Sequence, residues 1–278
     1  METHIKDFGE RSGHHEHYGN TKPTPLPDDA YCDNYIAANG LALLKRAPKD
    51  RPWHLVLNFT GPHAPLDITK RMEERTRTFP QPNRNTEFDA PTHVAMRQNY
   101  AVMCENIDRW LGVFLDELKQ RGELDNTIVV FSSDHGEMLG DHDRWGKTLP
   151  YHASVGVPLV IAGPGFQRGR ISQALVSHID LGATFLTSAG LGHMNGTSAR
   201  SLRPVLTGEK TQHREVVTSG LNDWRLAFDG RYKLVRGFEK QGEQLFDLHA
   251  DPVENINLAA KHPAIVKRLA QHLPAQAR

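Results

Sequence analysis

One segment of the chain, residues 132–151, concentrates side chains that could carry out chemistry. It follows an apolar run at residues 127–133 that is typical of a buried strand, and Asp134 and His135 come at the end of that run. A carboxylate oxygen and an imidazole nitrogen both bind divalent cations, and Gly136 lets the chain turn sharply after them. The pattern predicts a metal site at which a cation holds and polarises an oxyanion.

Lys147 adds a compact positive charge to the same segment. Its ammonium group can bind the oxyanion that the cation holds, and Gly146 before it lets the backbone approach closely. The alternative interpretation is an acidic surface loop with incidental charge pairs, a common arrangement. Two ligands also fall short of a complete metal site, so the residue types alone leave both interpretations open.

His63 is the candidate in a second loop, in the sequence Gly-Pro-His-Ala-Pro-Leu after an apolar run at residues 53–59. An imidazole there can donate a hydrogen bond to an oxyanion or protonate a leaving group. A single histidine in a proline-rich turn can equally be structural. The histidines of residues 13–20 have no clear ligand spacing, and we interpret them as part of a polar loop.

Ser132 and Ser133 are the hydroxyl groups nearest to these candidates. They lack the G-x-S-x-G turn that exposes a hydrolase serine, so we interpret them as the end of a strand. Asp180 is predicted to cap a short helix at residues 181–189.

Strand-like and helix-like segments alternate over residues 1–205. The predicted strands are residues 53–59, 127–133, 157–162 and 174–177, and the two main predicted helices are residues 28–46 and 92–122. Such alternation favours an α/β fold with a mostly parallel sheet flanked by helices. Ligands bind at the carboxyl ends of strands in these sheets, where His63 and Asp134 stand.

The pattern changes after residue 205 to short strands, which predict a second domain at residues 206–278. Asp229–Gly230 is a hairpin signal, and a final helix is predicted at residues 263–272. This part is predicted to be a small antiparallel sheet with one helix.

The composition excludes some classes of partner. The chain has 278 residues and a formal net charge of +0, which gives no indication of a nucleic-acid partner. No apolar stretch is long enough for a membrane span, and no secretory leader is visible, so the sequence leaves the compartment open. Its two cysteines, Cys32 and Cys104, indicate neither a disulfide framework nor a zinc site.

Taken together, the segments resemble the sulfatase family of the alkaline-phosphatase superfamily, over nearly the whole chain. The motifs that carry the resemblance are FSSDHGEMLGDHDRWGK, PWHLVLNFTGPHAP, VGVPLVIAGPG, LVSHIDLGATFLTSAG, DGRYKLV and EQLFDLHADPVENINLA. The last contains the Asp-Pro-x-Glu-x-x-Asn-Leu pattern of that family's C-terminal subdomain, at residues 251–258.

The resemblance implies an alkaline-phosphatase-like α/β fold and hydrolysis of small-molecule sulfuric esters. It assigns Asp134 and His135 to one divalent cation, which is expected to be Ca²⁺, with Mg²⁺ or Mn²⁺ as alternatives. It assigns Lys147 and His63 to catalysis and to binding of the sulfate group. Many sulfatases have Asn where His135 stands, and the Asp-His form is also similar to relatives that hydrolyse phosphonate and phosphate monoesters.

The sequence also departs from the family. The family's nucleophile is the Cys or Ser of a C/S-x-P-x-R motif, and neither Cys32 nor Cys104 lies in such a motif. The family also has an Asp-Asp metal-binding pair that follows an apolar strand, whereas no apolar strand precedes Asp28 and Asp29. We therefore expect an N-terminally truncated chain that is inactive alone for lack of a nucleophile. Its open core is expected to pair with another chain. A non-catalytic remnant that binds an anion or a partner is the remaining alternative.

Overall fold

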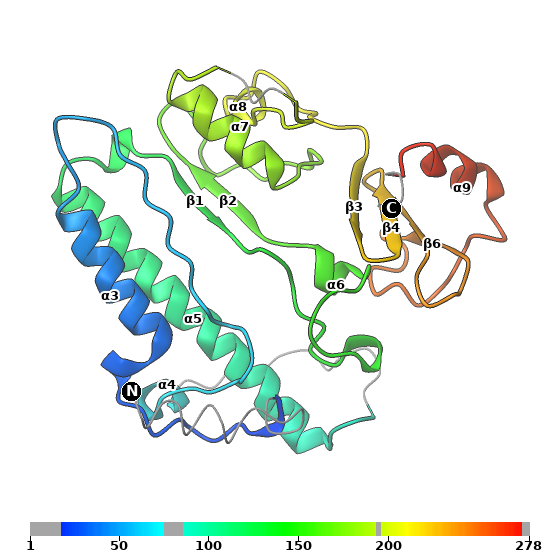
Figure 1. Ribbon diagram of the computed structural model, residues 1–278, viewed down its shortest axis with the longest axis horizontal. Helices are drawn as coiled ribbons and strands as arrows, with labels where there is room; N and C mark the ends of the chain where they lie inside the picture. Colours follow the sequence, from blue (N-terminus) through cyan, green and yellow to red (C-terminus); the bar gives the residue numbers. More distant parts are fainter. Residues whose placement is uncertain (1–17, 75–85, 193–195, 274–278) are drawn as a thin grey trace. The chain divides into compact units, whose positions relative to one another are not determined.

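The computed structural model describes residues 18–74, 86–192 and 196–273, drawn as coloured ribbon in Figure 1. They form two compact units, one built from residues 1–127 and 139–144 and the other from residues 128–138 and 145–278. The predicted boundary near residue 205 stays a prediction. Histidines 14, 15 and 17 of the predicted polar loop lie outside the described residues.

Two long helices form the first unit, α3 (Cys32–Lys45) and α5 (Ala90–Gln120). The short elements η1 (Asp28–Ala30), α4 (Lys70–Glu73) and η2 (Leu124–Asn126) accompany them. Both predicted helices are therefore present, but neither begins at the predicted residue. Asp89 caps α5 by accepting the Thr92 N–H at 2.8 Å, so Thr92 lies within the helix. The turn at Asp28–Ala30 delays the start of α3 to Cys32.

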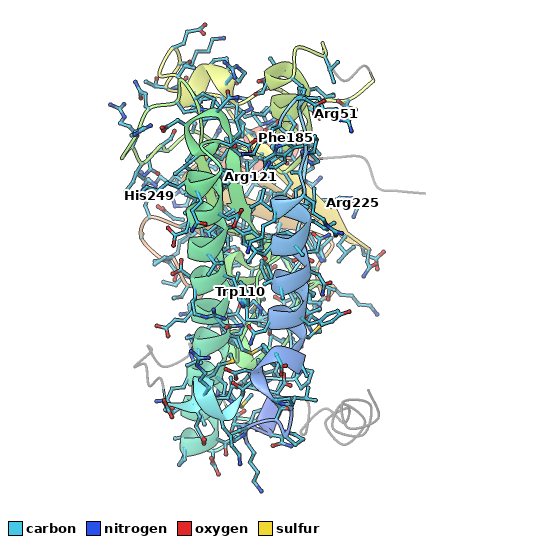
Figure 2. All side chains as sticks on the ribbon, turned by 90° about the vertical axis from the view of Figure 1, so that its left-hand side faces the viewer. Arg51, Trp110, Arg121, Phe185, Arg225 and His249 are labelled. Carbon is cyan, nitrogen blue, oxygen red and sulfur yellow. The ribbon has the colours of Figure 1, made fainter. Side chains whose placement is uncertain are left out.

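Polar side chains join α3 to α5 along their length. Asn34 Oδ1 accepts hydrogen bonds from Asn106 Nδ2 at 2.9 Å and from Trp110 Nε1 at 2.7 Å. At the other end, Arg121 donates to the carbonyl oxygen of Lys45 at 3.0 Å. The contacts advance in the same direction on both helices, so the two helices run parallel, with Trp110 in the layer between them in Figure 2.

The segment predicted as a strand at residues 53–59 forms none in the structure. Its side chains still alternate between half-buried and exposed, the period of an extended chain. Leu57 packs so closely on α3 that a Cβ at Gly40 would lie 2.4 Å from its Cδ2. The predicted strand at residues 53–59 is therefore absent from the structure, although the exposure of its side chains alternates. A strand also needs a hydrogen-bonded partner, and the described residues provide none for this segment.

The second unit begins with β1 (Val129–Ser132), which pairs antiparallel with β2 (Leu159–Ala162). No two strands pair in parallel among the described residues, contrary to the predicted mostly parallel sheet. A parallel pair needs a long crossover, usually a helix, whereas the connection here contains only η3 (Asp141–Asp143) and the single turn of α6 (His152–Val155). Instead of a fourth strand, Leu175 forms an isolated bridge with Arg214. Two helices follow, α7 (Ile179–Ser188) and α8 (Arg203–Leu206).

The C-terminal part is the predicted antiparallel sheet, with strand order β3-β4-β5-β6. The strands are β3 (Val217–Leu221), β4 (Trp224–Phe228), β5 (Tyr232–Arg236) and β6 (Glu243–Asp247), followed by the helix α9 (Pro263–Ala270). Gly230, at φ 97°, makes the predicted turn between β4 and β5.

Both faces of this sheet are buried. On one face Leu234 and Leu245 pack on Leu269 of α9. On the other face Trp224 and Phe246 belong to a cluster that includes Tyr151 and Val155. The sheet therefore packs directly on the segment that follows Lys147.

A helix that crosses a membrane must be both long and apolar. Of the helices that the described residues form, none is both long and apolar enough to cross a membrane.

Candidate functional site

Asp134 and His135 stand just beyond the end of β1, as predicted. Ser132 is the last residue of the strand, and Ser133 Oγ donates to the carbonyl oxygen of His135 at 2.7 Å. The His135 N–H donates to Asp134 Oδ1 at 2.9 Å. Partial burial acts to raise the pKa of Asp134, but this hydrogen bond and the charge of His135 hold it below its usual value. The Asp134 side chain is 84% exposed, so an ionised carboxylate faces solvent.

The geometry of this pair suits one cation. His135 Nδ1 lies 2.8 Å from the carbonyl oxygen of Gly136, which can only accept, so Nδ1 donates there and Nε2 is the nitrogen that a cation would bind. Nε2 lies 3.5 Å from Asp134 Oδ2. A cation bonded to both atoms at a right angle would hold them about 3.3 Å apart. The two residues therefore fit two adjacent positions of one coordination sphere.

The rest of a coordination sphere is not seen in this part of the chain. Within residues 18–74, 86–192 and 196–273, no group of three or more His, Cys, Asp or Glu side chains is placed to hold a metal ion. Ca²⁺ prefers about six to eight oxygen ligands, so the pair supplies a minority of them.

Gly136 fixes the path of the chain after the pair. Its N–H donates to the carbonyl oxygen of Ser154 at 2.8 Å. A Cβ at this position would lie 2.0 Å from the carbonyl oxygen of Ala153, which is backbone and cannot move aside. The close approach of two backbone segments therefore requires glycine here.

Lys147 is half-buried and lies in the same unit as Asp134 and His135. The residue before it is held from two sides: the Gly146 N–H donates to Glu137 Oε1 at 2.5 Å, and the Gly146 oxygen accepts from the Met138 N–H at 2.9 Å. These bonds close the loop at its base. They give Glu137, one of several acidic residues in the segment, a structural role.

The middle of the charged segment, Leu139–Arg144, belongs to the first unit instead. Asp141 Oδ1 lies 3.8 Å from Arg97 Nη1 of α5, and Asp143 Oδ1 accepts the Thr86 N–H at 2.6 Å. Arg97 also donates to the carbonyl oxygen of Leu139 at 2.9 Å. Asp141 and Asp143 lie in the same sequence segment as Asp134 and Lys147, but their contacts hold the loop against α5 and the residues before it.

His63 lies in the first unit, in an exposed turn. Its Nδ1 is 2.5 Å from the carbonyl oxygen of Ala64, which can only accept, so this nitrogen donates there. The turn is anchored by Asp33 of α3, whose Oδ1 accepts from the Thr60 and Gly61 N–H groups at 2.8 and 3.0 Å. Asp33 is 1% exposed, and sequence reasoning missed this anchor because it lies on a different element.

A cavity of about 450 Å³ within the first unit is lined in part by His63. Its walls are mainly apolar, with Leu26 and Met103 among them. The Tyr31 hydroxyl, also in the wall, donates to the carbonyl oxygen of Asp67 at 3.2 Å. Burial, together with nearby carboxylates, raises the pKa of Tyr31, so its phenol stays protonated at neutral pH.

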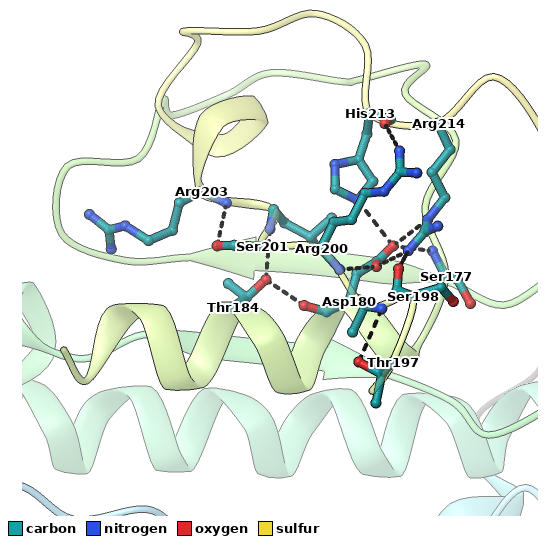
Figure 3. A network of polar contacts seen from close by, with 12 residues as sticks. Ser177, Asp180, Thr184, Thr197, Ser198, Arg200, Ser201, Arg203, His213 and Arg214 are labelled. Atoms are coloured by element: carbon teal, nitrogen blue, oxygen red, sulfur yellow. Dashed lines mark hydrogen bonds and ion pairs between the residues drawn. The ribbon is translucent and has the colours of Figure 1, made fainter. Parts of the chain in front are cut away.

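Asp180 organises the second unit and is the residue whose role was mispredicted. It lies inside α7, where the N-cap is His178, and it is fully buried. Its carboxylate accepts from the Ser177 and Arg200 N–H groups at 3.0 and 2.9 Å and pairs with the Arg214 guanidinium, as Figure 3 shows. Asp180 therefore joins three segments that are distant in sequence. A helix-cap pattern could not indicate this.

The chain was compared with known proteins. The family model described as Sulfatase matches residues 2–191, and the one described as N-sulphoglucosamine sulphohydrolase, C-terminal, matches residues 140–278. An arylsulfatase of Clostridium perfringens is 25% identical over 86% of this chain and 56% of its own length. A choline-sulfatase of Rhizobium meliloti is 31% identical over 81% of this chain and 50% of its own length.

A phosphonate monoester hydrolase from Silicibacter pomeroyi has a similar structure, with a TM-score of 0.84 and 24% identity over 98% of this chain and 67% of that one. This likeness confirms the predicted alkaline-phosphatase-like α/β fold class. The chain spans about half the length of the two curated relatives, 56% and 50%. Since one family model covers residues 2–191 and the other reaches residue 278, the chain belongs to the sulfatase family.

Proposed function

We propose that this chain is part of a metal-dependent hydrolase of sulfuric esters, in which Lys147 binds the sulfate group and Asp134 and His135 bind one cation. One observation carries the proposal: the three residues belong to the same unit and to the connection between β1 and β2, and the two metal-binding atoms are 3.5 Å apart. A carboxylate, an imidazole and an ammonium group together suit an oxyanion held by a cation.

The cation we propose is Ca²⁺, with Mg²⁺ or Mn²⁺ as alternatives. The sulfatase family generally uses a divalent metal. Bound at this pair, it would neutralise and polarise the oxygens of the sulfate group. With few ligands on this chain, its affinity is expected to be weak. Asp134 would bind as an ionised carboxylate and His135 through Nε2, because its Nδ1 already donates to Gly136.

Lys147 and His63 would act on the ester itself. Lys147 would offset the charge of the sulfate oxygens with an ammonium group whose position the loop restricts. The role of His63, a hydrogen bond to the sulfate group or protonation of the leaving oxygen, stays a prediction. So do the inactivity of this chain alone and its pairing with another chain.

Hydrolysis of a phosphonate or phosphate monoester is the second candidate. The residue His135 favours it, because the Asp-His form resembles relatives that act on those esters. The two candidates share the fold and the pair of metal ligands, so only the preferred anion separates them. A non-catalytic remnant would bind an anion without turnover.

Calorimetric titration with Ca²⁺ and with sulfate tests the proposal. We expect Asp134→Asn to abolish detectable Ca²⁺ binding, whereas the exposed control Asp116→Asn leaves it unchanged. Lys147→Ala should raise the dissociation constant for sulfate about tenfold or more, since it removes a charge-assisted contact. Equal sulfate affinity in Lys147→Ala and the unchanged chain would remove Lys147 from the site. Tighter binding of methylphosphonate than of sulfate would favour the second candidate.

A further inference from the structure

The backbone on both sides of Lys147 is in an unusual conformation. Gly146 has φ 77° and Thr148 has φ 78°, in the left-handed region. Glycine adopts this region freely, but a β-branched residue such as threonine does so at an energetic cost. Such a conformation persists only where the surroundings hold it, and it is concentrated at functional sites.

The C-terminal sheet supplies the contacts that hold this backbone. Trp224 Nε1 of β4 donates to the carbonyl oxygen of Thr148 at 2.8 Å. Lys233 Nζ of β5 donates to the carbonyl oxygen of Pro150 at 2.6 Å. The first contact is thus made to the immediate neighbour of Lys147, and the second to the residue three positions after it.

A third contact comes from beyond β6. Glu254 Oε2 accepts the N–H of His152 at 2.6 Å. The same carboxylate forms an ion pair with Lys233, so two of the three contacts are joined to each other. Glu254 is itself at φ 58°, and it is the glutamate of the Asp-Pro-x-Glu-x-x-Asn-Leu pattern.

The three residues Trp224, Lys233 and Glu254 are almost completely buried, with 6%, 2% and 4% of each whole residue exposed. Burial lowers the pKa of Lys233, while the charge of Glu254 and its hydrogen bond oppose that effect. A buried ion pair is seldom more stabilising than apolar side chains of similar volume. Stability alone therefore does not explain why charged side chains are buried here. Their hydrogen bonds to the backbone of residues 150 and 152 do explain it.

We propose that Trp224, Lys233 and Glu254 form a clamp that positions Lys147 for anion binding. They do not touch the anion; they fix the backbone of residues 148–152, and through it the direction in which the Lys147 side chain leaves the chain. Apolar contacts support the clamp, because Tyr151 packs edge-on against Phe238 with ring centroids 5.7 Å apart. This inference rests on the proposed function of Lys147, and it gives the C-terminal sheet a part in the site.

Trp224→Phe tests the clamp, because it keeps an aromatic ring in the core and removes the indole donor. The matched control is Trp110→Phe, which removes the indole hydrogen bond to Asn34 in the other unit. We expect both variants to lose similar stability, since each loses one hydrogen bond. Only Trp224→Phe should raise the sulfate dissociation constant, by about fivefold.

Amide hydrogen exchange at Gly146 and His152 provides the second measurement, and it does not depend on sulfate binding. We expect exchange about tenfold faster in Trp224→Phe and unchanged exchange in Trp110→Phe. Unchanged exchange in Trp224→Phe would overturn the clamp. A second result would also overturn it: faster exchange in Trp224→Phe without any change in its sulfate affinity, provided that Lys147→Ala binds sulfate weakly. If Lys147→Ala binds sulfate normally, the proposed function fails instead, and the exchange data alone decide whether the clamp holds this backbone.

Discussion

Lys233 and Glu254 form an ion pair in which 3% and 2% of the two side chains are exposed. Neither residue lies in the loop that carries Asp134 and Lys147, yet both bind the backbone that continues it. The charge on each is compensated by the other and by hydrogen bonds, so the removal of one leaves the other buried and unpaired.

Glu254→Gln is therefore expected to lower the free energy of unfolding by about 3 kcal/mol, measured by urea denaturation. Glu243→Gln is the matched control, because it removes the partner of Arg236 in an exposed pair of the same sheet, at 49% and 39% exposure. The control should lose at most about 1 kcal/mol. Equal losses in the two variants would contradict the role given to burial.

Acid should weaken the protein through Asp247. The hydrogen bonds from Arg231 lower the pKa of Asp247 from 3.8 to about 2. A depressed native pKa means that the contribution to stability is complete above the unfolded value and is lost as pH falls from about 4 to about 2. Asp247→Asn should remove this part of the pH dependence, measured as urea midpoints at pH values across that window. The exposed control Asp116→Asn should retain it; a steep acid loss that persists in Asp247→Asn would point to other carboxylates.

Asp180→Asn should destabilise the protein by about 3 kcal/mol, because the Arg214 guanidinium loses its buried counter-charge. The amide would also place a donor against the donors that now surround the carboxylate. Asp28→Asn is the control, since Asp28 pairs with an Arg71 side chain that is 81% exposed. Its loss should be at most about 1 kcal/mol. A thermal midpoint for Asp180→Asn equal to that of the control would show that the network is dispensable.

Two glycine-to-alanine changes should have opposite effects. Gly136→Ala places a Cβ 2.0 Å from the oxygen of Ala153, so it should lower the thermal midpoint and weaken Ca²⁺ binding at Asp134. Gly112→Ala places its Cβ in open space on α5, where the better helix propensity should add about 1 kcal/mol. Loss of stability in Gly112→Ala, or none in Gly136→Ala, would contradict this reading of the backbone contacts.

The sequence was most informative where the signal is local. The antiparallel sheet after residue 205 was predicted correctly, because its short strands and the Asp-Gly turn after β4 (Trp224–Phe228) are read within a few positions. α5 was predicted from apolar residues at helical spacing, although its cap proved to be Asp89. Asp134 and His135 stand at the end of a strand for the same local reason.

Features that depend on distant partners were not predictable. The antiparallel pairing of β1 with β2 leaves no period in the sequence, since a buried strand is apolar whichever direction its neighbour runs. The pairing of Asp180 with Arg214 and of Lys233 with Glu254 likewise joins residues about 20 or more positions apart. No local pattern in the sequence indicates either pairing.

The path of the chain between the two units limits how gene segments can be exchanged. Residues 139–144 belong to the first unit and their neighbours on both sides to the second, so the chain passes between the units after residues 127, 138 and 144. No single crossover within the gene can exchange one unit and leave the other intact. An exchange of one unit that leaves the other unchanged requires crossovers at all three of these places. The segment between Asp134 and Lys147 thus ties the evolution of the two units to each other.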